Sequence, residues 1–423
     1  MKDSGIEWIG EIPEGWEVGQ IGQLYSERRT KVSDKDYPPL SVTMKGILPQ
    51  LSTAAKTDAH DDRKLVCKGD FAINSRSDRR GSCGISEQDG SISLINTVLQ
   101  PRGEMNPRYY NWLFHTSMFA DEFYKWGHGI VDDLWTTGWS DMKKIGVPVP
   151  SKCEQKQIAE HLNFECSNID TILSKTRSSI EEYKKLKQAV ITQAVTKGVR
   201  GEREMKPTGF TRWSEIPFDW DLKRVKSCVA SISSGLSAVT DDANSEESGK
   251  FVLRTSAVSS GFFVPTEAKP VLKSAVNRLI CPVEPDTLIV SRMNTASMVG
   301  ACAYVANNHP NTFLPDKLWK IKFLPNYHTK YMWYALNSVP AKSWFSELAT
   351  GASSSMQNIS INDFTSNYLP IPAFSEQKEI ADYLDAKCAE IDGLIAKKEQ
   401  LVKELESYKK SLIYEVVTGK REV

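Results

Sequence analysis

Two long, helix-like repeats constrain this chain most. Residues 147–170 ("VPVPSKCEQKQIAEHLNFECSNID") align without a gap with residues 369–392 ("LPIPAFSEQKEIADYLDAKCAEID"), and 11 of the 24 positions are identical. Each copy opens with P-x-P, which favours extended backbone before a helix. Each continues with apolar residues at spacings of three and four up to a glycine, Gly198 or Gly419. The pattern predicts two helices of about 45 residues, and helices this long need a partner, most simply each other.

The apolar spacing indicates a coiled-coil seam, because it is sustained over several heptads. Cys166 and Cys388 occupy equivalent places in it, and we interpret them as small buried hydrophobic residues rather than a redox pair. Ser151 and Glu154 have the spacing of a capping box, whereas Ser375 is the expected cap of the second helix. The predicted seam residues are Ile158, Leu162, Cys166, Ile169, Leu173, Thr176, Ile180, Tyr183, Leu186 and Val190, and then Ile380, Leu384, Cys388, Ile391, Leu394, Leu401, Leu405, Tyr408 and Leu412.

A second repeat links the start of the chain to its middle. "MKDSGIEWIGEIPEGW" (1–16) matches "MKPTGFTRWSEIPFDW" (205–220), with 7 of 16 positions identical. The intervening segments, 17–146 and 221–368, contain short strand-like and helix-like runs and share a D-x4-S-R-x7-G framework with divergent surroundings. The chain is therefore a tandem repeat with two mixed α/β globules. Such a common framework with different surfaces would suit two different ligands.

Composition and motifs narrow the function classes. The 53 basic and 53 acidic residues argue against one broad basic field for polyanions. No apolar run is long enough to span a bilayer, no signal-peptide core opens the chain, and the scattered cysteines suggest reduced thiols, so we expect a cytoplasmic protein. We find no nucleotide-binding, hydrolase or amino-methyltransferase motif and no metal-ligand spacing. The sequence therefore offers no recognisable motif for catalysis, a metal or a cofactor.

The chain resembles the DNA-specificity subunits of type I restriction–modification systems. The resemblance rests on "SGIEWIGEIPEGW", on its echo "TGFTRWSEIPFDW", and on the doubled P-x-P…EQK-x-IA…L…ID helices, which recur in the order of that family along the whole chain. It implies an α+β fold with two mixed α/β target-recognition domains joined by two long helices in an antiparallel coiled coil, a circular tandem repeat with pseudo-twofold symmetry. The expected parts are a first domain (1–150, arm 1–16), a central helix (151–204), a second domain (205–372, arm 205–220) and a C-terminal helix (373–423).

The resemblance also implies partners. Each domain would read one half of a bipartite site in double-stranded DNA. The helices would set the gap and dock two methyltransferase subunits, which motor–nuclease subunits would join. S-adenosylmethionine, ATP and Mg would then belong to partner subunits. A coiled-coil interaction scaffold without DNA specificity is the alternative, and a stand-alone nuclease is a third possibility.

Candidate DNA contacts follow from the framework and the loops. Arg76 and Arg292 match between the copies, which favours a framework or phosphate role, such as pairing with Asp70 or Asp286, over base reading. The loops before the helices hold further candidates, whereas Trp135 and Trp139 are expected to pack. The candidate set is Ser75, Arg76, Arg79, Arg80, Lys125, His128, Ser291, Arg292, Asn294, Gln357 and Asn358.

The helix starts carry the second candidate set. The E-Q-K strings could contact partner subunits or tie each domain to its helix. The candidates for the coiled coil and partner interface are Glu154, Gln155, Ile158, Leu162, Ile169, Glu376, Gln377, Ile380, Leu384 and Ile391. If the helices are antiparallel, the arm 1–16 continues from the end of the second helix, Met1 and Val423 lie at the same end, and Trp16 and Trp220 pack on equivalent surfaces.

Overall fold

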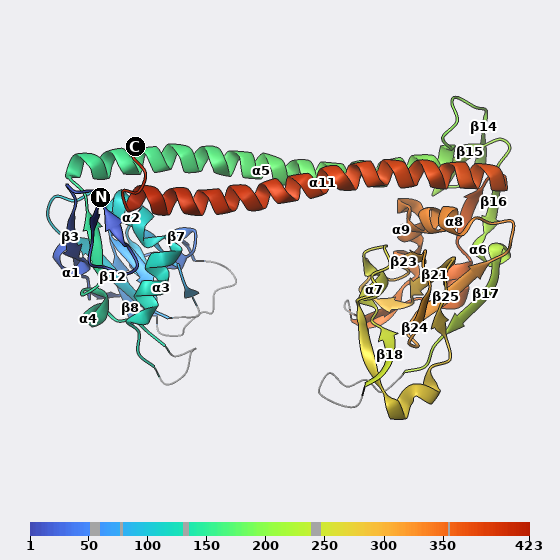
Figure 1. Ribbon diagram of the computed structural model, residues 1–423, viewed down its shortest axis with the longest axis horizontal. Helices are drawn as coiled ribbons and strands as arrows, with labels where there is room; N and C mark the ends of the chain where they lie inside the picture. The colour runs from blue at the N-terminus through green and yellow to red at the C-terminus, as the bar shows by residue number, and fades with distance from the viewer. Residues whose placement is uncertain (51–59, 77–78, 130–134, 238–246, 354–355) are drawn as a thin grey trace. The chain divides into compact units, whose positions relative to one another are not determined.

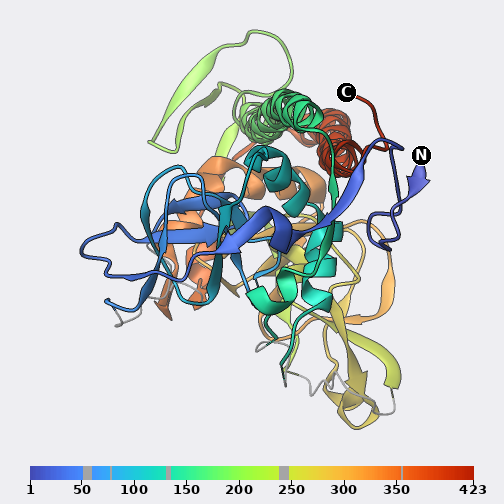
Figure 2. The same cartoon turned by 90° about the vertical axis from the view of Figure 1, so that its left-hand side faces the viewer.

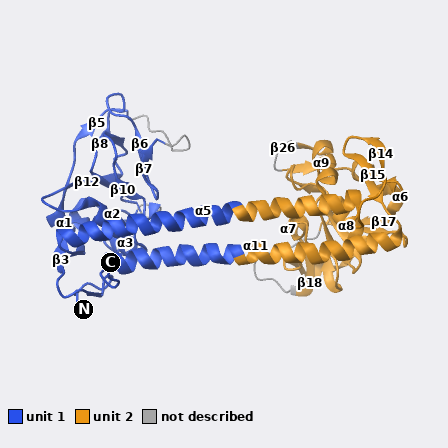
Figure 3. Ribbon diagram, turned by 90° about the horizontal axis from the view of Figure 1, so that it is seen from above, with its two compact units in different colours: residues 1–178, 398–423 blue, residues 179–397 orange. Residues whose placement is uncertain are grey.

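The chain folds into two units. A computed structural model describes residues 1–50, 60–76, 79–129, 135–237, 247–353 and 356–423. Unit 1 comprises residues 1–178 and 398–423, and unit 2 comprises residues 179–397 (Figure 3). Each unit holds one globular domain together with a stretch of both long helices, α5 (Lys152–Lys197) and α11 (Phe374–Val417).

The domain of unit 1 is built on antiparallel strands. Its main sheet has the order β10-β9-β12-β4, beside the sheets β11-β8-β5, β13-β3, β6-β7 and β1-β2. The elements are β1 (Lys2–Asp3), β2 (Glu11–Ile12), β3 (Glu17–Gln20), α1 (Ile21–Leu24), β4 (Tyr25–Glu27), β5 (Lys31–Val32), β6 (Leu40–Thr43), β7 (Gly46–Pro49), β8 (Arg63–Val66), β9 (Phe71–Asn74), β10 (Cys83–Ile85), β11 (Gly90–Ile92), β12 (Asn96–Pro101), α2 (Pro107–Phe114), α3 (Ser117–Lys125), α4 (Trp139–Met142) and β13 (Gly146–Val149).

The domain of unit 2 repeats this plan. Its sheet β23-β21-β25-β17 has the connectivity of β10-β9-β12-β4, and β28-β16 corresponds to β13-β3; the other sheets are β19-β18-β24-β20, β22-β27-β26 and β14-β15. The elements are β14 (Met205–Phe210), β15 (Trp213–Pro217), β16 (Asp221–Arg224), α6 (Val225–Cys228), β17 (Val229–Ser234), β18 (Glu247–Leu253), α7 (Ser256–Ser259), β19 (Ala268–Leu272), the 3₁₀ helix η3 (Lys273–Arg278), β20 (Pro282–Val283), β21 (Thr287–Ser291), β22 (Met293–Asn294), β23 (Cys302–Val305), β24 (His309–Phe313), β25 (Leu318–Phe323), α8 (Thr329–Asn337), α9 (Val339–Leu348), β26 (Thr350–Ser353), β27 (Met356–Asn358), α10 (Ile361–Thr365) and β28 (Tyr368–Ile371).

The two long helices run side by side in opposite directions in each unit (Figures 1 and 2). In unit 1, Lys409 Nζ lies 2.6 Å from Asp170 Oδ1, and in unit 2 Lys187 Nζ lies 2.6 Å from Asp392 Oδ2. These two pairs are equivalent at the repeat offset of 222 residues. The predicted antiparallel coiled coil is confirmed.

Part of the predicted seam is wrong. Leu186, Leu394, Leu401 and Tyr408 are exposed, whereas Lys187 is buried in the seam. Beside Leu186 and Tyr408, the seam position is taken by a lysine that an aspartate of the opposite helix neutralises. Beside Leu394 and Leu401, the next residue, Ile395 or Val402, takes the seam position instead. The other proposed interface residues are buried as expected, namely Ile158, Leu162, Ile169, Ile380, Leu384 and Ile391, and so are Cys166 and Cys388.

The two helix starts differ. At the first, the Ser151 amide donates to Glu154 Oε2 (2.9 Å) and the Glu154 amide donates to Ser151 Oγ (3.3 Å), so the predicted capping box is confirmed. The expected cap at Ser375 is wrong, because α11 already begins at Phe374 and the carbonyl of Ala373 accepts the Glu376 and Gln377 amides. Ala373 occupies the place of Ser151 and has no hydroxyl group to cap with.

The arms pack where the repeat predicted. In unit 1, Tyr414 Oη donates to the carbonyl of Ile9 (3.3 Å), and Lys420 Nζ donates to the same carbonyl (2.7 Å), so the arm lies against the end of α11. Both chain ends lie at this place (Figure 1), which confirms the expected proximity of Met1 and Val423. The helix-ending glycines have left-handed φ angles and meet the arm tryptophans: Gly419 faces Trp16 and Gly198 faces Trp220.

Candidate nucleic-acid interface

A short three-stranded ladder brings candidate residues of unit 1 together. His128 and Thr136 exchange both backbone hydrogen bonds (2.9 and 3.0 Å), and Thr136 also forms an antiparallel bridge with Arg76. The amide of Thr137 donates to the carbonyl of Ser75 (3.0 Å). We call these five residues ribbon 1. It joins the end of the framework S-R segment to the loop that precedes α5.

Unit 2 contains the equivalent ladder. Strands β22, β27 and β26 pair Met293 with Asn358 and Asn358 with Thr350, and Asn294 pairs with Gln357. We call these five residues ribbon 2. Thr350 and Asn358 correspond to His128 and Thr136 at the repeat offset of 222 residues, so the two ladders have one construction and different side chains.

The framework arginines differ in register between the ribbons. Arg76 stands directly opposite Thr136, whereas Arg292 precedes the residue opposite Asn358. The backbone hydrogen bonds show the same shift. The Ile359 amide donates to the carbonyl of Arg292 (3.0 Å), whereas the equivalent Thr137 amide donates to the carbonyl of Ser75. A shift of one residue along a strand moves a side chain to the other face. Arg76 and Arg292 therefore present to different sides of their ladders.

The proposed pairing of these arginines with framework acids is wrong. Asp70 binds Arg28 instead, with Nε to Oδ2 at 2.6 Å and Nη2 to Oδ1 at 3.1 Å. Asp286 accepts from Tyr304 Oη at 3.4 Å. Among the residues that the structure describes, no acid pairs with the guanidinium of Arg76. Its backbone is nevertheless fixed on both sides, since its amide donates to Asn74 Oδ1 (3.0 Å) and its carbonyl accepts from Tyr124 Oη (2.8 Å).

Several other candidate side chains are already engaged. Ser75 contacts Thr97, Ser291 donates to the carbonyl of Met293, and Asn294 Nδ2 donates to Ser259 Oγ. The exposed cations near ribbon 1 are paired as well. Arg80 contacts Asp121 and the ring of Tyr124, Lys125 contacts Glu7 and Glu122, and Arg79 also has a partner. These residues are therefore held in place by the domain.

The tryptophan of the loop packs as predicted. Trp135 Nε1 donates to the carbonyl of Tyr124 (2.8 Å), and a Cβ at Gly127 would overlap the same indole. Trp139, at the start of α4, is half-buried. Neither indole is presented as a platform for base stacking.

The candidate residues chosen from the sequence did not include Thr136, Met293 or Thr350. The 222-residue offset of the helix repeat could have indicated two of these positions. Applied to the loops before the helices, it aligns position 128 with 350 and position 136 with 358. Within the described residues, no group of histidine, cysteine and carboxylate side chains could hold a metal ion.

The comparisons with known proteins all point to one family. The sequence model described as "Type I restriction modification DNA specificity domain" matches residues 217–404. A putative type I restriction enzyme MjaX specificity subunit from Methanocaldococcus jannaschii is 23% identical over 97% of this chain and 95% of its own length. The MjaVIII specificity subunit of the same organism is 24% identical over 97% and 93%.

Residues 217–404 match the DNA-specificity domain of type I restriction–modification systems, and the chain is similar to specificity subunits of such systems along nearly its whole length. Solved structures share the fold: a chain from a structural study of complex assembly in a type I system superimposes with a TM-score of 0.74 at 13% identity, covering 97% of this chain and 100% of that one. The HsdS subunit of Thermoanaerobacter tengcongensis gives 0.55 at 15% identity, covering 97% and 98%.

The glutamine of each string ties a recognition domain to its helix. Gln155 Oε1 accepts the Asn106 amide just before α2 (2.9 Å), and Gln377 Oε1 accepts the His328 amide just before α8 (2.8 Å). Each Nε2 donates back to the preceding proline carbonyl, of Pro150 or Pro372, at 2.9 Å. The two glutamines therefore act within the chain, as the tether that the sequence offered as one alternative.

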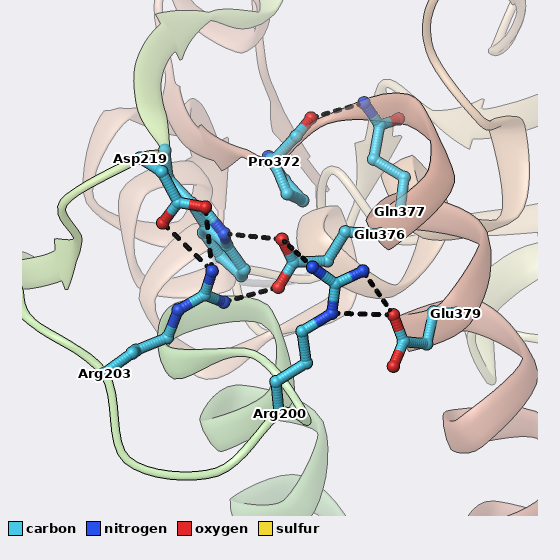
Figure 4. A network of polar contacts seen from close by, with 8 residues as sticks. Arg200, Arg203, Asp219, Pro372, Glu376, Gln377 and Glu379 are labelled. Atoms are coloured by element: carbon cyan, nitrogen blue, oxygen red, sulfur yellow. Dashed lines mark hydrogen bonds and ion pairs between the residues drawn. The ribbon is translucent and has the colours of Figure 1, made fainter.

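The glutamates hold the arm tryptophans, with different surroundings. Trp16 Nε1 donates to Glu154 Oε1 (2.9 Å), and Trp220 Nε1 donates to Glu376 Oε2 (3.2 Å). The pKa of Glu154 is lowered, chiefly because the Ser151 hydrogen bond stabilises its charge. Glu376 is only 2% exposed and also contacts Arg203 at 2.5 Å, while Arg200 binds Glu379 beside it (Figure 4).

Proposed function

We propose that each unit reads one half of a bipartite double-stranded DNA site through its ribbon. The supporting observation is the pair of ladders, which share one backbone construction and carry different side chains. Base edges in the major groove carry sequence information, and one small module reaches only a few of them. Two modules with one scaffold and different surfaces suit a site in two unlike halves.

We propose that the coiled coil sets the gap between the half-sites. α5 has 46 residues and α11 has 44, so the two are matched in length. Seven residues of helix add about 10 Å, which is about three base pairs of B-DNA. Inserting one heptad into each helix, between seam positions, should lengthen the gap by about that amount and leave both half-sites unchanged. Altered half-sites with the original gap would contradict the ruler.

The long helices also offer a repeated surface for a partner. In unit 1 one edge of the pair carries Asp170 and Glu406, and in unit 2 it carries Asp392. In each unit this charged edge faces the recognition domain of that unit. In unit 1, Trp112 Nε1 donates to Asn163 Oδ1 (3.1 Å), which lies one heptad before Asp170. In unit 2, Lys330 Nζ contacts Asp385 (2.6 Å), which lies one heptad before Asp392.

The opposite edge is apolar and uncovered. We call it the apolar edge; it consists of Ile172, Leu401 and Tyr408 in unit 1 and of Leu186 and Leu394 in unit 2, each between 36% and 48% exposed. Ile172 corresponds to Leu394 and Leu186 to Tyr408 at the repeat offset. A surface that occurs twice by internal symmetry fits one partner protein bound twice. We therefore propose the apolar edge as the docking surface of two methyltransferase subunits.

Catalysis then belongs to the assembly. We propose that S-adenosylmethionine, ATP and Mg bind to methyltransferase and motor–nuclease subunits, and that this chain contributes recognition and geometry. Among the described residues, no helix is both long and apolar enough to cross a membrane.

The function is tested by reconstituting the full chain with the methyltransferase encoded beside it. Methylation mapping should give one motif in two halves with a fixed gap. A stable complex that protects and methylates no bipartite site would favour the scaffold alternative, and metal-dependent cleavage by the purified chain alone would favour a nuclease.

Docking is tested separately with Ile172→Ser plus Tyr408→Ser and with Leu186→Ser plus Leu394→Ser. Each pair should remove about one methyltransferase subunit per complex in native mass spectrometry. Phe164→Ser is the matched control, because Phe164 is 65% exposed on α5 and is not one of the residues of the apolar edge. Full assembly by both pairs, with weakened assembly by the control, would contradict the assignment.

A further inference from the structure

We infer that one row of side chains on each ribbon selects the bases of its half-site: Arg76, Thr136 and His128 in unit 1, and Met293, Asn358 and Thr350 in unit 2. This rests on the proposed function. Residues directly opposite each other in an antiparallel ladder project on the same face. Each row is therefore a line of three neighbouring side chains, one from each strand.

The row side chains lie at or near the surface, with His128 Nε2 at 3.5 Å from Asp141 Oδ2, and the opposite faces are occupied. His128 and Thr136 are exposed and Arg76 is half-buried; Thr350 is exposed and Asn358 and Met293 are half-buried. The other face of ribbon 2 carries Asn294, which is committed to Ser259, and Gln357, which also has a partner. In both units the ladder bonds come from the backbone, so the side chains of the row can vary without loss of the scaffold.

Ribbon 2 and its neighbour Arg292 contain unsatisfied polar atoms. Asn358 Oδ1 and Arg292 Nε are buried, and the structure gives neither a hydrogen-bond partner within the described residues. Buried polar atoms in native proteins nearly always have partners, so each exception calls for an explanation. A base would meet Asn358 Oδ1 once this amide turns to the surface, and the turn breaks no hydrogen bond of Oδ1 within the described residues.

The chemistry of the two rows differs. Arginine binds the O6 and N7 acceptors of guanine in bidentate fashion, and an imidazole N–H can donate to the same acceptors. Asparagine binds adenine in bidentate fashion, and methyl-bearing side chains contact the methyl group of thymine. The row of unit 1 therefore selects a G·C pair in the first half-site, and the row of unit 2 selects A·T pairs in the second.

The one-residue register difference explains why the matched arginines need not act alike. Arg76 lies on the row of ribbon 1. Arg292 lies on the opposite face of ribbon 2, so Met293 takes the corresponding place. A repeated S-R framework can therefore present an arginine to a base in one unit and withdraw it in the other.

The test exchanges row residues in the full complex with the methyltransferase. The double variant Thr136→Asn with His128→Thr should change the preference of unit 1. The ratio of methylation at the original first half-site to methylation at a half-site with an A·T substitution should fall by about 10- to 100-fold. The second half-site and the gap should stay unchanged. Asn358→Thr with Thr350→His should affect only the second half-site. Arg80→Ala and Lys125→Ala, which remove exposed cations beside the row, should leave the motif unchanged.

The outcomes separate the two levels of the proposal. A wild-type complex that methylates no bipartite site defeats the proposed function. A wild-type complex that does, with row variants that retain the original preference, overturns the assignment of the rows. Thr136→Asn alone keeps the test decisive if a double variant fails to fold, because Thr136 is exposed and its ladder bonds are made by its backbone.

Discussion

The two glutamates at the helix starts should contribute unequally to stability, although their sequence motif is identical. Glu376 is 2% exposed and binds the guanidinium of Arg203, whereas Glu154 is partly exposed and binds a serine and an indole. Removing one partner of a buried ion pair costs about 3–5 kcal/mol. Arg203 keeps Asp219 at 2.8 Å and is 18% exposed, which reduces the cost of Glu376→Gln to about 2–3 kcal/mol.

Glu154→Gln should cost only about 0.5–1 kcal/mol, because the amide oxygen can still accept from Ser151 and Trp16. For a unit of this size, Glu376→Gln should lower the melting temperature by about 5–10 °C and Glu154→Gln by less than about 4 °C. Calorimetry of the full chain at neutral pH measures both, and exchange of the Trp220 indole N–H reports unit 2. An equal or larger effect at Glu154 would refute the reasoning.

Three further outcomes follow from particular contacts. Tyr109→Phe removes a buried hydroxyl that donates to the carbonyl of Val417 (2.7 Å) and should destabilise unit 1 by about 1–3 kcal/mol in urea unfolding. Gly419→Ala should release the N-terminal arm, measured as faster proteolysis of the arm, because φ is +71° and a Cβ would lie 2.4 Å from Pro13. Burial lowers the pKa of His115, so stability should fall as pH drops through about 6.5, where the unfolded state takes up the proton first, and His115→Asn should flatten this pH dependence.

The helices, their antiparallel pairing and the packing of the arms could be predicted because the helix and arm motifs each occur twice in the sequence. The seam could be predicted only in part. Leu186 and Tyr408 looked like seam residues because they are apolar, but the positions taken by Lys187 and Lys409 are set by aspartates more than 200 residues away, which local spacing does not reveal. The framework arginines were misjudged for the same reason, since the acid near Arg76 in sequence binds Arg28 in space.

The helix starts show how one motif acquires two electrostatic roles. Position 151 is serine and its equivalent, position 373, is alanine. With a hydroxyl available, Glu154 completes a capping box; without it, Glu376 is left to accept Arg203 from the segment that follows α5. Both arrangements still hold an arm tryptophan against a helix-ending glycine. The E-Q pair therefore joins arm, domain and helix in both units. Variation around it should alter stability while leaving DNA recognition, which we propose to depend on the ribbons, unchanged.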